Sequence, residues 1–475
     1  MGRRKFKRKV IENLTITGIA DKGKGVARDE TGRVIFVDDV APGDVVDVLI
    51  YKKRKAYLQG SVQKTVKYSD DRVEPFCEHF GTCGGCKFQH IPYEKQIEYK
   101  QDIVDNALRR IGKVEIGEFK DILPCEEPSH YRNKLEFSFS NKRWLTYEEL
   151  NNSEISNVED VLGFHRAGAF DKILNINECH LQVEPTNQLR NSMKEIAIEQ
   201  GHTFYDVRKN TGFLRNMIVR ITTTGEVMLL LSVGIDDRAQ IDNYLNAVLE
   251  KNPSLTCVYF TVNKKVNDSW GDLEMVHFYG KKSIEEYLGK VKFEIGPKSF
   301  FQTNTKQAVR LFDVVKEFAE LSGEENVYDL YTGLGSIGLY LADQCKQVVG
   351  IEEIAAAIED AKENCKRNNI DNAVFYAGDV KDILTTEFSE KHGKPDVVIT
   401  DPPRVGMHPK VVEMLLELEA PKIVYVSCKP STQARDLNLL SEKYDVMKVQ
   451  PVDMFPQTHH IETVALLVKR VSKPE

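Results

Sequence analysis

The spacing of hydrophobic and polar positions divides the chain into three stretches of different character. Residues 10–67 contain short β-branched runs separated by Gly, Asp and Pro, which is typical of a small all-β barrel. Residues 130–285 mix strand-like runs with amphipathic helices predicted near 184–200 and 236–250, which favours an α+β domain. From about residue 286, near-continuous apolar strands alternate with helices. This last pattern predicts a parallel, doubly wound α/β sheet covered on both faces.

Two shorter segments complete this division. Residues 93–112 carry apolar side chains at helical spacing, whereas residues 69–92 have little periodicity. A length of 475 residues also exceeds one ordinary domain. We therefore expect a multidomain chain whose three units are an N-terminal OB-like barrel (1–68), a central α+β domain (69–92 plus 122–285) and a C-terminal Rossmann-like α/β domain (93–121 plus 286–475).

Charge is distributed unevenly between these units. The whole chain has a formal net charge of −7, which by itself argues against a nucleic-acid binder. Residues 1–68, however, hold 16 Lys and Arg against 8 Asp and Glu, so the remainder is strongly acidic. A basic N-terminal unit on an acidic body suggests contact with a polyanion. The run from Lys52 to Lys55, followed by Tyr57, fits that interpretation and fits a solvated hairpin turn equally well.

Targeting signals and cysteine usage indicate a reducing compartment. The first residues are not followed by an apolar run, and no window approaches 18 consecutive apolar residues, so we expect neither a secretory signal nor a membrane span. Nine cysteines in a large chain of this kind are expected in the cytoplasm, where cysteine clusters more often bind metal or perform catalysis than form disulfides.

The predicted C-terminal sheet ends in residues suited to a nucleoside cofactor. A glycine-rich turn over residues 329–338 follows the first strand, and Glu352, at the end of the second, can accept hydrogen bonds from ribose hydroxyls. Gly378-Asp379 follows the third strand, and Asp401-Pro402-Pro403-Arg404 makes a rigid corner after the fourth.

Two cofactor classes compete for this site. Gly333, Gly335 and Gly338 match the dinucleotide fingerprint in form, but nicotinamide enzymes seldom carry Asp-Pro-Pro after the fourth strand. The combination resembles the fold of S-adenosylmethionine-dependent methyltransferases, in which the acidic residue after the second strand binds ribose.

Further candidate chemistry lies near the same predicted edge. Cys428 follows the fifth strand beside Lys429, a position that favours a reactive thiolate over an inert packing cysteine. The pair His459-His460 precedes Glu462 near the chain end and is equally compatible with a solvated loop. Upstream, residues 298–304 place polar side chains behind two phenylalanines.

Together these segments closely resemble the RNA (uracil-5)-methyltransferase family. The matching segments are Ser299–Asn304, the Gly333 loop, Asp401–Arg404, Ser427–Pro430 with Ala434–Asp436, and Asp453–Glu462. The chain departs from the family at Lys429, where Asn is commoner, and at the end of the glycine loop, and neither departure touches a residue with an assigned chemical role.

The resemblance implies a mechanism and a set of residues. Cys428 would attack C6 of uracil so that C5 becomes nucleophilic towards the methyl group of S-adenosylmethionine, and Glu462 would then remove the C5 proton. The residues that match the family's cofactor-binding positions are Gln302, Tyr331, Glu352 and Asp401. Asp401 is also suited to accept from uracil N3–H.

The remaining cysteines include a metal-site pattern. Cys77-x5-Cys83-x2-Cys86 supplies three thiolates, and Cys179 is the candidate for a fourth. Zinc and iron–sulfur clusters both accept four cysteines, and the uneven spacing suits a cluster somewhat better. The family resemblance implies a [4Fe–4S] cluster. The four cysteines without companions, which we expect to be packing residues, are Cys125, Cys257, Cys345 and Cys365.

The resemblance also implies a substrate. The N-terminal barrel resembles the TRAM domain, an RNA-binding module, and barrel and cluster together favour the branch that methylates 23S ribosomal RNA over the transfer RNA branch. We expect a monomer that flips its target base out of the RNA. The alternatives are a transfer RNA enzyme, a redox enzyme using the cluster and a dinucleotide, and an RNA-binding scaffold, against which the intact Cys428, Glu462 and Asp401 argue.

Overall fold

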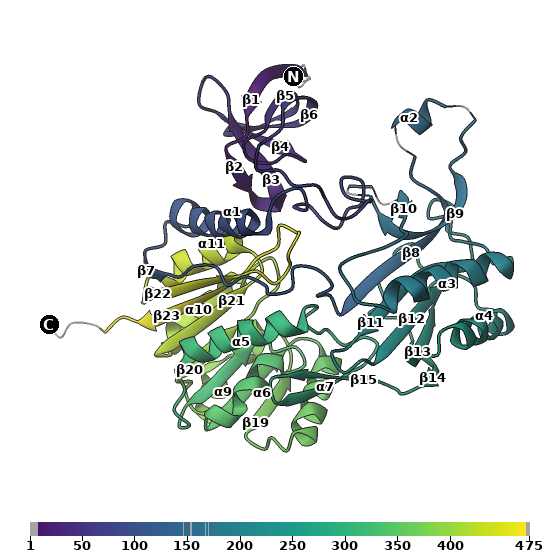
Figure 1. Ribbon diagram of the computed structural model, residues 1–475. Helices are drawn as coiled ribbons and strands as arrows, with labels where there is room; N and C mark the ends of the chain where they lie inside the picture. Colours follow the sequence, from purple (N-terminus) through teal and green to yellow (C-terminus); the bar gives the residue numbers. More distant parts are fainter. Residues whose placement is uncertain (1–7, 146, 153, 167, 170, 472–475) are drawn as a thin grey trace, which may run out of the picture.

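The computed structural model describes residues 8–471 except 146, 153, 167 and 170. Three large sheets follow one another along the chain and lie in three separate regions of the molecule (Figure 1). Four of the basic residues noted at the N-terminus, Arg3, Arg4, Lys5 and Lys7, lie outside the described residues. No helix in the described part of the chain is long and apolar enough to cross a membrane.

The N-terminal sheet has six strands in the order β1-β5-β6-β4-β3-β2. Alternate residues of β5, among them Val46, Val48 and Ile50, are fully buried, as expected for a sheet with one face on a core. A Cβ at Gly60 would overlap Val48, so this close strand pairing requires glycine. The elements are β1 (Lys9–Thr15), β2 (Gly18–Ala20), η1 (Asp21–Gly23), β3 (Lys24–Arg28), β4 (Val34–Asp38), β5 (Val45–Lys53) and β6 (Tyr57–Lys67).

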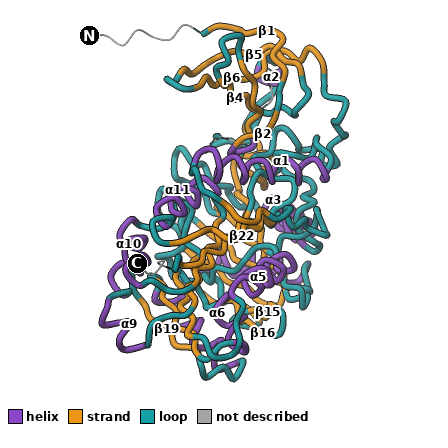
Figure 2. The backbone as a smooth tube through the Cα atoms, turned by 90° about the vertical axis from the view of Figure 1, so that its left-hand side faces the viewer, coloured by secondary structure: helices purple, strands orange, loops and turns teal. Residues whose placement is uncertain are grey.

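A long helix separates this sheet from the C-terminal domain. After turns over residues 69–92, α1 (Tyr93–Asp105) runs into the π-helical turn η2 (Asn106–Ile111), and β7 (Ile116–Phe119) follows. Figures 1 and 2 both show α1 lying between the N-terminal sheet above and α11 below. Strand β7 pairs with β22, so this segment belongs to the C-terminal sheet.

The central domain is a seven-stranded mixed sheet in the order β10-β9-β8-β11-β12-β13-β14. Helices α3 and α4 cover one face, while residues such as Ile218 and Leu230 on the other face pack towards the C-terminal domain. The elements are β8 (Lys134–Lys142), α2 (Tyr147–Leu150), β9 (Val158–His165), β10 (Ile173–Asn175), α3 (Thr186–Glu199), β11 (Leu214–Ile221), β12 (Val227–Val233), α4 (Arg238–Lys251), β13 (Leu255–Val262) and β14 (Val276–Gly280).

The C-terminal sheet has the order β19-β18-β17-β20-β21-β23-β22-β7. The five strands recognised in the sequence are parallel, but β23 runs antiparallel to both β21 and β22. The expectation of a wholly parallel sheet is therefore wrong at this end, because β22 and β23 are joined by a short loop without a helical crossover. The strands are β17 (Asn326–Leu330), β18 (Gln347–Glu352), β19 (Ala373–Ala377), β20 (Val397–Thr400), β21 (Lys422–Ser427), β22 (Tyr444–Val452) and β23 (Glu462–Lys469).

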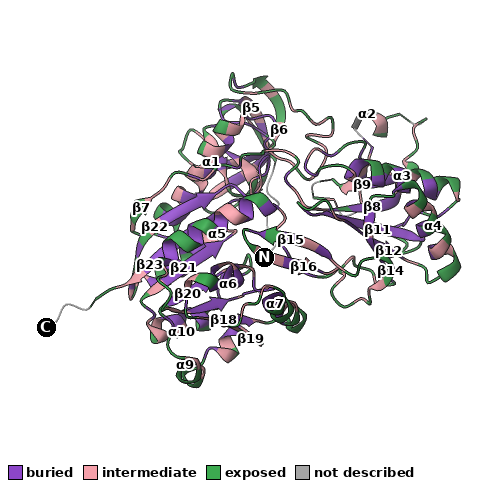
Figure 3. Ribbon diagram, turned by 60° about the horizontal axis from the view of Figure 1, so that its bottom comes forward, coloured by how far each residue is buried: buried purple, intermediate pink, exposed green. Residues whose placement is uncertain are grey.

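Helices cover both faces of this sheet, as the sequence predicts. Neighbouring strand residues alternate between the two cores: Val348 faces α5 and α7, and Val349 faces α10 and α11. Figure 3 shows the resulting buried strands beneath helices with exposed outer faces. The remaining elements are β15 (Ile284–Leu288), β16 (Val291–Ile295), α5 (Thr305–Ala319), α6 (Ser336–Leu341), η3 (Ala342–Gln344), α7 (Ala355–Arg367), α8 (Val380–Ile383), α9 (Thr386–His392), α10 (Pro409–Leu418) and α11 (Pro430–Leu440).

Candidate active site

The candidate residues of the C-terminal domain gather at one edge of its sheet. Tyr331 directly follows β17, Glu352 ends β18, Asp401 follows β20 and Cys428 follows β21. These strands are parallel, so their carboxyl ends meet at the same edge, which is where α/β sheets bind ligands.

Strand β23 brings Glu462 to Cys428. In the antiparallel pairing of β21 with β23, Ser427 lies opposite Thr463. Cys428 directly follows β21, and Glu462 is the first residue of β23. The two therefore lie opposite each other across this antiparallel pair. Glu462 is also buried, and this burial and the charge of Asp401 raise its pKa. The thiol and the two carboxyl groups therefore form one cluster.

The glycine turn is fixed by two carboxylates. Buried Asp329 accepts hydrogen bonds from the Thr332 hydroxyl and from Gly338 N at 3.0 Å. Glu352 accepts from Gly333 N at 3.1 Å. A Cβ at Gly338 would lie 2.9 Å from the Asp329 carboxylate, so only glycine fits. Glu352, the predicted ribose-binding residue, thus lies directly against the turn.

The segment with Gln302 reaches the site from outside the sheet. It precedes α5, whose first turn is capped by the Asn304 side chain, accepting from Gln307 N at 3.2 Å. The Asn304 amide also donates to Met454 O at 3.0 Å. Gln302 is therefore tied to the loop before Glu462, although its side chain has no described hydrogen bond to the other candidates.

Burial and like charge perturb all three groups of the Cys428 cluster. Burial, followed by the charges of Glu462 and Asp401, raises the pKa of the Cys428 thiol to about 11, and Arg404 opposes this. Burial and the nearby Asp329 raise the pKa of Asp401 to about 7. Burial and Asp401 raise the pKa of Glu462 well above its ordinary value. All three groups therefore hold their protons more tightly than the same side chains do in water.

We expect Glu462→Gln to lower the pKa of Cys428 below about 11, because the substitution removes a neighbouring negative charge. Arg404→Met should raise the same pKa, because it removes the opposing positive charge. The pH dependence of Cys428 alkylation by iodoacetamide, followed by peptide mass spectrometry, measures both shifts. Glu413→Gln, at an exposed position of α10, is the control. Identical midpoints in all four proteins would contradict this electrostatic description.

The loop over residues 453–461, which we call the catalytic loop, is held by α1. The ammonium group of Lys100 lies 2.6 Å from the Asp453 carboxylate, and both side chains are fully buried. The Tyr93 hydroxyl donates to the same carboxylate at 2.9 Å. Removing one partner of a buried ion pair typically costs about 3–5 kcal/mol, so this contact fixes the loop firmly.

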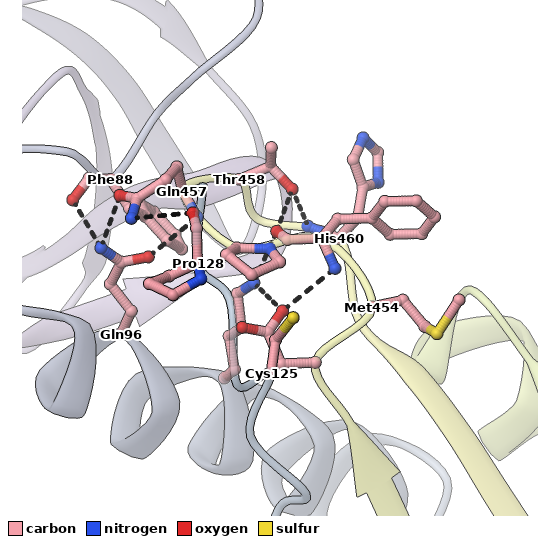
Figure 4. Close-up of polar contacts among 12 residues, drawn as sticks. Phe88, Gln96, Cys125, Pro128, Met454, Gln457, Thr458 and His460 are labelled. Carbon is pink, nitrogen blue, oxygen red and sulfur yellow. Dashed lines mark hydrogen bonds and ion pairs between the residues drawn. The ribbon is translucent and has the colours of Figure 1, made fainter. Parts of the chain in front are cut away.

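A pair of glutamines makes the second attachment. The Gln96 amide donates to the Gln457 side chain at 2.9 Å and accepts from Gln457 N at 3.1 Å, and the two lie face to face in Figure 4. Gln96 also donates to Phe88 O and Ile91 O. The sequence pattern missed Gln96 and Lys100, although polar residues on the buried stripe with Val104 were a usable signal.

The histidine pair lies in a half-buried position on the catalytic loop, which excludes the solvated-loop alternative. The rings of His459 and His460 are 4.2 Å apart, and His460 lies 3.5 Å from the Arg404 guanidinium. Burial lowers the pKa of His459 to about 4 and that of His460 to about 3. Both are therefore neutral at pH 7.

The four cysteines singled out in the sequence line one cavity of about 420 Å³. These residues are Cys77, Cys83, Cys86 and Cys179. Burial first, and then the charges of the other cysteines, raises the pKa of Cys86 to about 12. Within the described residues, no group of three or more His, Cys, Asp or Glu side chains is arranged to hold a metal ion.

Comparisons with known proteins bear on the family of this chain. The family model described as tRNA (Uracil-5-)-methyltransferase matches residues 279–470, and the TRAM domain model matches residues 5–62. RNA methyltransferases named as uncharacterised, from Bacteroides thetaiotaomicron and Porphyromonas gingivalis, are 48% and 47% identical, over 95% and 96% of this chain and 100% and 99% of their own.

A solved structure matches over nearly the whole length. It is the Pyrococcus abyssi tRNA (uracil-54, C5)-methyltransferase in complex with S-adenosyl-L-homocysteine, at 30% identity and a TM-score of 0.73, covering 96% of this chain and 99% of that one. From these relatives and the sheet-edge site, the chain belongs to the RNA (uracil-5)-methyltransferase family and is an S-adenosylmethionine-dependent RNA methyltransferase with an N-terminal TRAM domain.

Proposed function

We propose that this enzyme methylates C5 of a specific uridine in 23S ribosomal RNA, with Cys428 as nucleophile and Glu462 as general base. The observation that supports this chemistry is the β21–β23 register, by which Cys428 lies opposite Glu462, while the charge of Asp401 acts on both. A thiol and a carboxyl group close together are what attack at C6 and proton removal at C5 require.

In this mechanism the residues act in a fixed order. The Cys428 sulfur bonds to C6 of uracil while its proton passes to Asp401, and electron density moves onto C5. S-adenosylmethionine, when bound, would supply the methyl group that C5 takes and would leave as S-adenosylhomocysteine. Glu462, as carboxylate, then accepts the C5 proton, so that the C5=C6 double bond re-forms and the sulfur leaves and recovers its proton from Asp401. The raised pKa of Glu462 makes its carboxylate a stronger base than that of an ordinary glutamate.

The proposed cofactor residues fit the same edge. Glu352 is oriented by Gly333 N and suits the ribose hydroxyls, and Tyr331 adopts a positive φ of 62° at the start of the glycine turn. Gln302 approaches from the segment before α5. Asp401 follows β20, which lies between β17 and β21 in the sheet, so its carboxyl group is suited to orient the uracil.

The RNA class rests on different observations. The TRAM domain and the four-cysteine segment together resemble the 23S ribosomal RNA branch of the family. The match to the P. abyssi enzyme, however, covers 96% of this chain, so a TRAM-bearing chain of this length is also compatible with a transfer RNA substrate. Transfer RNA is therefore the second candidate.

Methylation of RNA transcripts in vitro distinguishes the two. We expect the enzyme to form 5-methyluridine in 23S ribosomal RNA and to leave transfer RNA from the same organism unmodified, as measured by nucleoside mass spectrometry with Cys428→Ala as the blank. Methylation of transfer RNA alone would contradict the ribosomal RNA proposal and assign the enzyme to the transfer RNA branch.

We also propose that Cys77, Cys83, Cys86 and Cys179 bind a [4Fe–4S] cluster. A single zinc ion holds four sulfurs at about 2.3 Å each, which requires a tight cage. The cysteines line a cavity of about 420 Å³, which offers more room than a single ion needs. Bound iron would also stabilise thiolates whose pKa values burial otherwise raises. The role supported by this position is structural, since uracil methylation requires no electron.

Metal analysis tests the cluster. Anaerobically purified protein should contain about four iron and four sulfide ions per chain. Cys179→Ser should lose most of this iron, while Cys257→Ser, a buried cysteine of β13, should retain it. One equivalent of zinc without iron would contradict the assignment.

A further inference from the structure

Residues 130–133 connect the cysteine cavity with the active site, and we call them the strap. On one side the strap pairs with the segment after Cys179. His130 N donates to His180 O at 2.8 Å, and Arg132 N donates to Leu181 O at 2.7 Å. Arg132 itself lines the cysteine cavity. The strap is therefore one wall of that cavity.

The other side of the strap contacts the catalytic loop. The buried hydroxyl of Tyr131 donates to Pro456 O at 3.0 Å. The Arg132 guanidinium lies 5.8 Å from the centre of the Phe455 ring. Next to the strap, Pro128 O accepts from the Gln457 side chain at 3.5 Å, and Figure 4 shows these two residues close together. Three consecutive residues of the catalytic loop, Phe455, Pro456 and Gln457, are thus held by the strap and its neighbour Pro128 as well as by α1.

Asn133 contacts the cofactor segment. Its amide nitrogen donates to Gln302 O at 2.8 Å and to the Thr305 hydroxyl at 2.9 Å. Its backbone nitrogen donates to Thr303 O at 2.8 Å. Asn133 thereby donates three hydrogen bonds to residues 302–305, while its carbonyl accepts one from Ile221 N of the central sheet.

Strand geometry explains how the strap contacts the cysteine cavity, the catalytic loop and the Gln302 segment. Arg132 makes a β-bridge with Gln182, so its side chain and those of its neighbours point to opposite sides. The Arg132 side chain lines the cavity and also reaches Phe455, while Tyr131 contacts Pro456 and Asn133 contacts Gln302. A displacement of the strap would therefore move the catalytic loop and the Gln302 segment together.

We propose that Tyr131 and Asn133 are positioning residues of the methyl-transfer reaction, each serving a different step. Asn133 holds the Gln302 segment in the shape that binds S-adenosylmethionine. Tyr131 holds the catalytic loop in the shape that lets Glu462 remove the C5 proton. This inference rests on the roles proposed for Gln302 and Glu462, and it does not require the cysteine cavity to hold a cluster.

Two variants separate these roles. Asn133→Asp keeps the side-chain shape but replaces the donor with an acceptor facing Gln302 O, so it should raise the Kd for S-adenosylmethionine about ten-fold in isothermal titration calorimetry. Tyr131→Phe removes one hydrogen bond. It should leave this Kd unchanged but slow the release of the methylated covalent RNA intermediate about ten-fold, measured by quench and denaturing electrophoresis.

Matched controls come from the central domain. Tyr259→Phe removes a hydroxyl that donates to Lys282 O at 2.7 Å, and Asn252→Asp replaces an amide that donates to Val248 O at 2.8 Å. Neither should change cofactor Kd or intermediate release. If Asn133→Asp does not fold, as judged by circular dichroism, Asn133→Ala carries the test with the same expected direction.

Reference variants separate this inference from the proposed function. If Gln302→Ala leaves the cofactor Kd unchanged, or Glu462→Gln releases its intermediate normally, the residue assignments themselves fail. If both references behave as expected while Asn133→Asp binds S-adenosylmethionine normally, or Tyr131→Phe releases its intermediate as fast as Tyr259→Phe, the strap is not a positioning element.

Discussion

Replacing Cys428 with Ala is expected to abolish both methyl transfer and covalent trapping of RNA. With 5-fluorouridine in the target RNA, the unmutated enzyme and S-adenosylmethionine should form an adduct that survives denaturation, because fluorine cannot leave C5 as a proton does. Without the thiol no bond to C6 forms. We expect turnover to fall by at least about 10³-fold, since loss of a covalent nucleophile costs on the order of 10⁶ in a serine protease.

The control for this prediction is another cysteine of the same domain. Cys365 is buried on α7, where it packs in the core, so Cys365→Ala should retain the adduct and most of the activity. Cofactor affinity of Cys428→Ala, measured by calorimetry, should stay near normal because the thiol is not among the proposed cofactor residues. Adduct formation by Cys428→Ala would remove this residue from the nucleophile role.

Glu462→Gln is expected to accumulate a covalent complex with ordinary, unfluorinated RNA. The variant retains the thiol and the cofactor site, so attack and methyl transfer proceed, but the amide cannot take the C5 proton. A general base contributes about 10²–10⁴-fold, and release of the product should slow by that amount. The lowered pKa of Cys428 expected in this variant favours thiolate attack and so acts in the same direction.

Labelled methyl groups make this result specific. In Glu462→Gln the label from S-adenosylmethionine should migrate with the protein on a denaturing gel, whereas in Glu413→Gln it should appear in free RNA. Rapid release of methylated RNA by Glu462→Gln would assign proton removal to another group, with Asp401 as the nearest carboxyl.

The sheet edge could be predicted because its strands are buried on both faces. Continuous apolar runs such as Val397–Ile399, alternating with helical patterns, favour buried strands, and parallel strands bring the residues after them to one edge. The antiparallel end could not be predicted in this way. Strand β23 carries Glu462 as its first residue, and only the register of Ser427 with Thr463 places that carboxyl group beside Cys428.

The residues of α1 that hold the catalytic loop could not be predicted, for a different reason. Gln96 and Lys100 occupy buried positions of α1, where they contact Gln457 and Asp453. These partners lie more than 350 residues away in the chain. Local periodicity counts apolar residues and gives no information on contacts of this range. Cys179 was a candidate because the first three cysteines needed a fourth ligand, and its place in the same cavity depends on long-range pairing with the strap.

Peptide mass spectrometry of the trapped adduct tests the central claim most directly. The unmutated enzyme is incubated with S-adenosylmethionine and 5-fluorouridine RNA, digested with protease and nuclease, and mapped across its nine cysteines. We predict one modified peptide, with Cys428 linked to a fluorouridine nucleotide that has gained one methyl group. A nucleotide linked to any other residue, or one on Cys428 without the methyl group, would contradict the proposed mechanism.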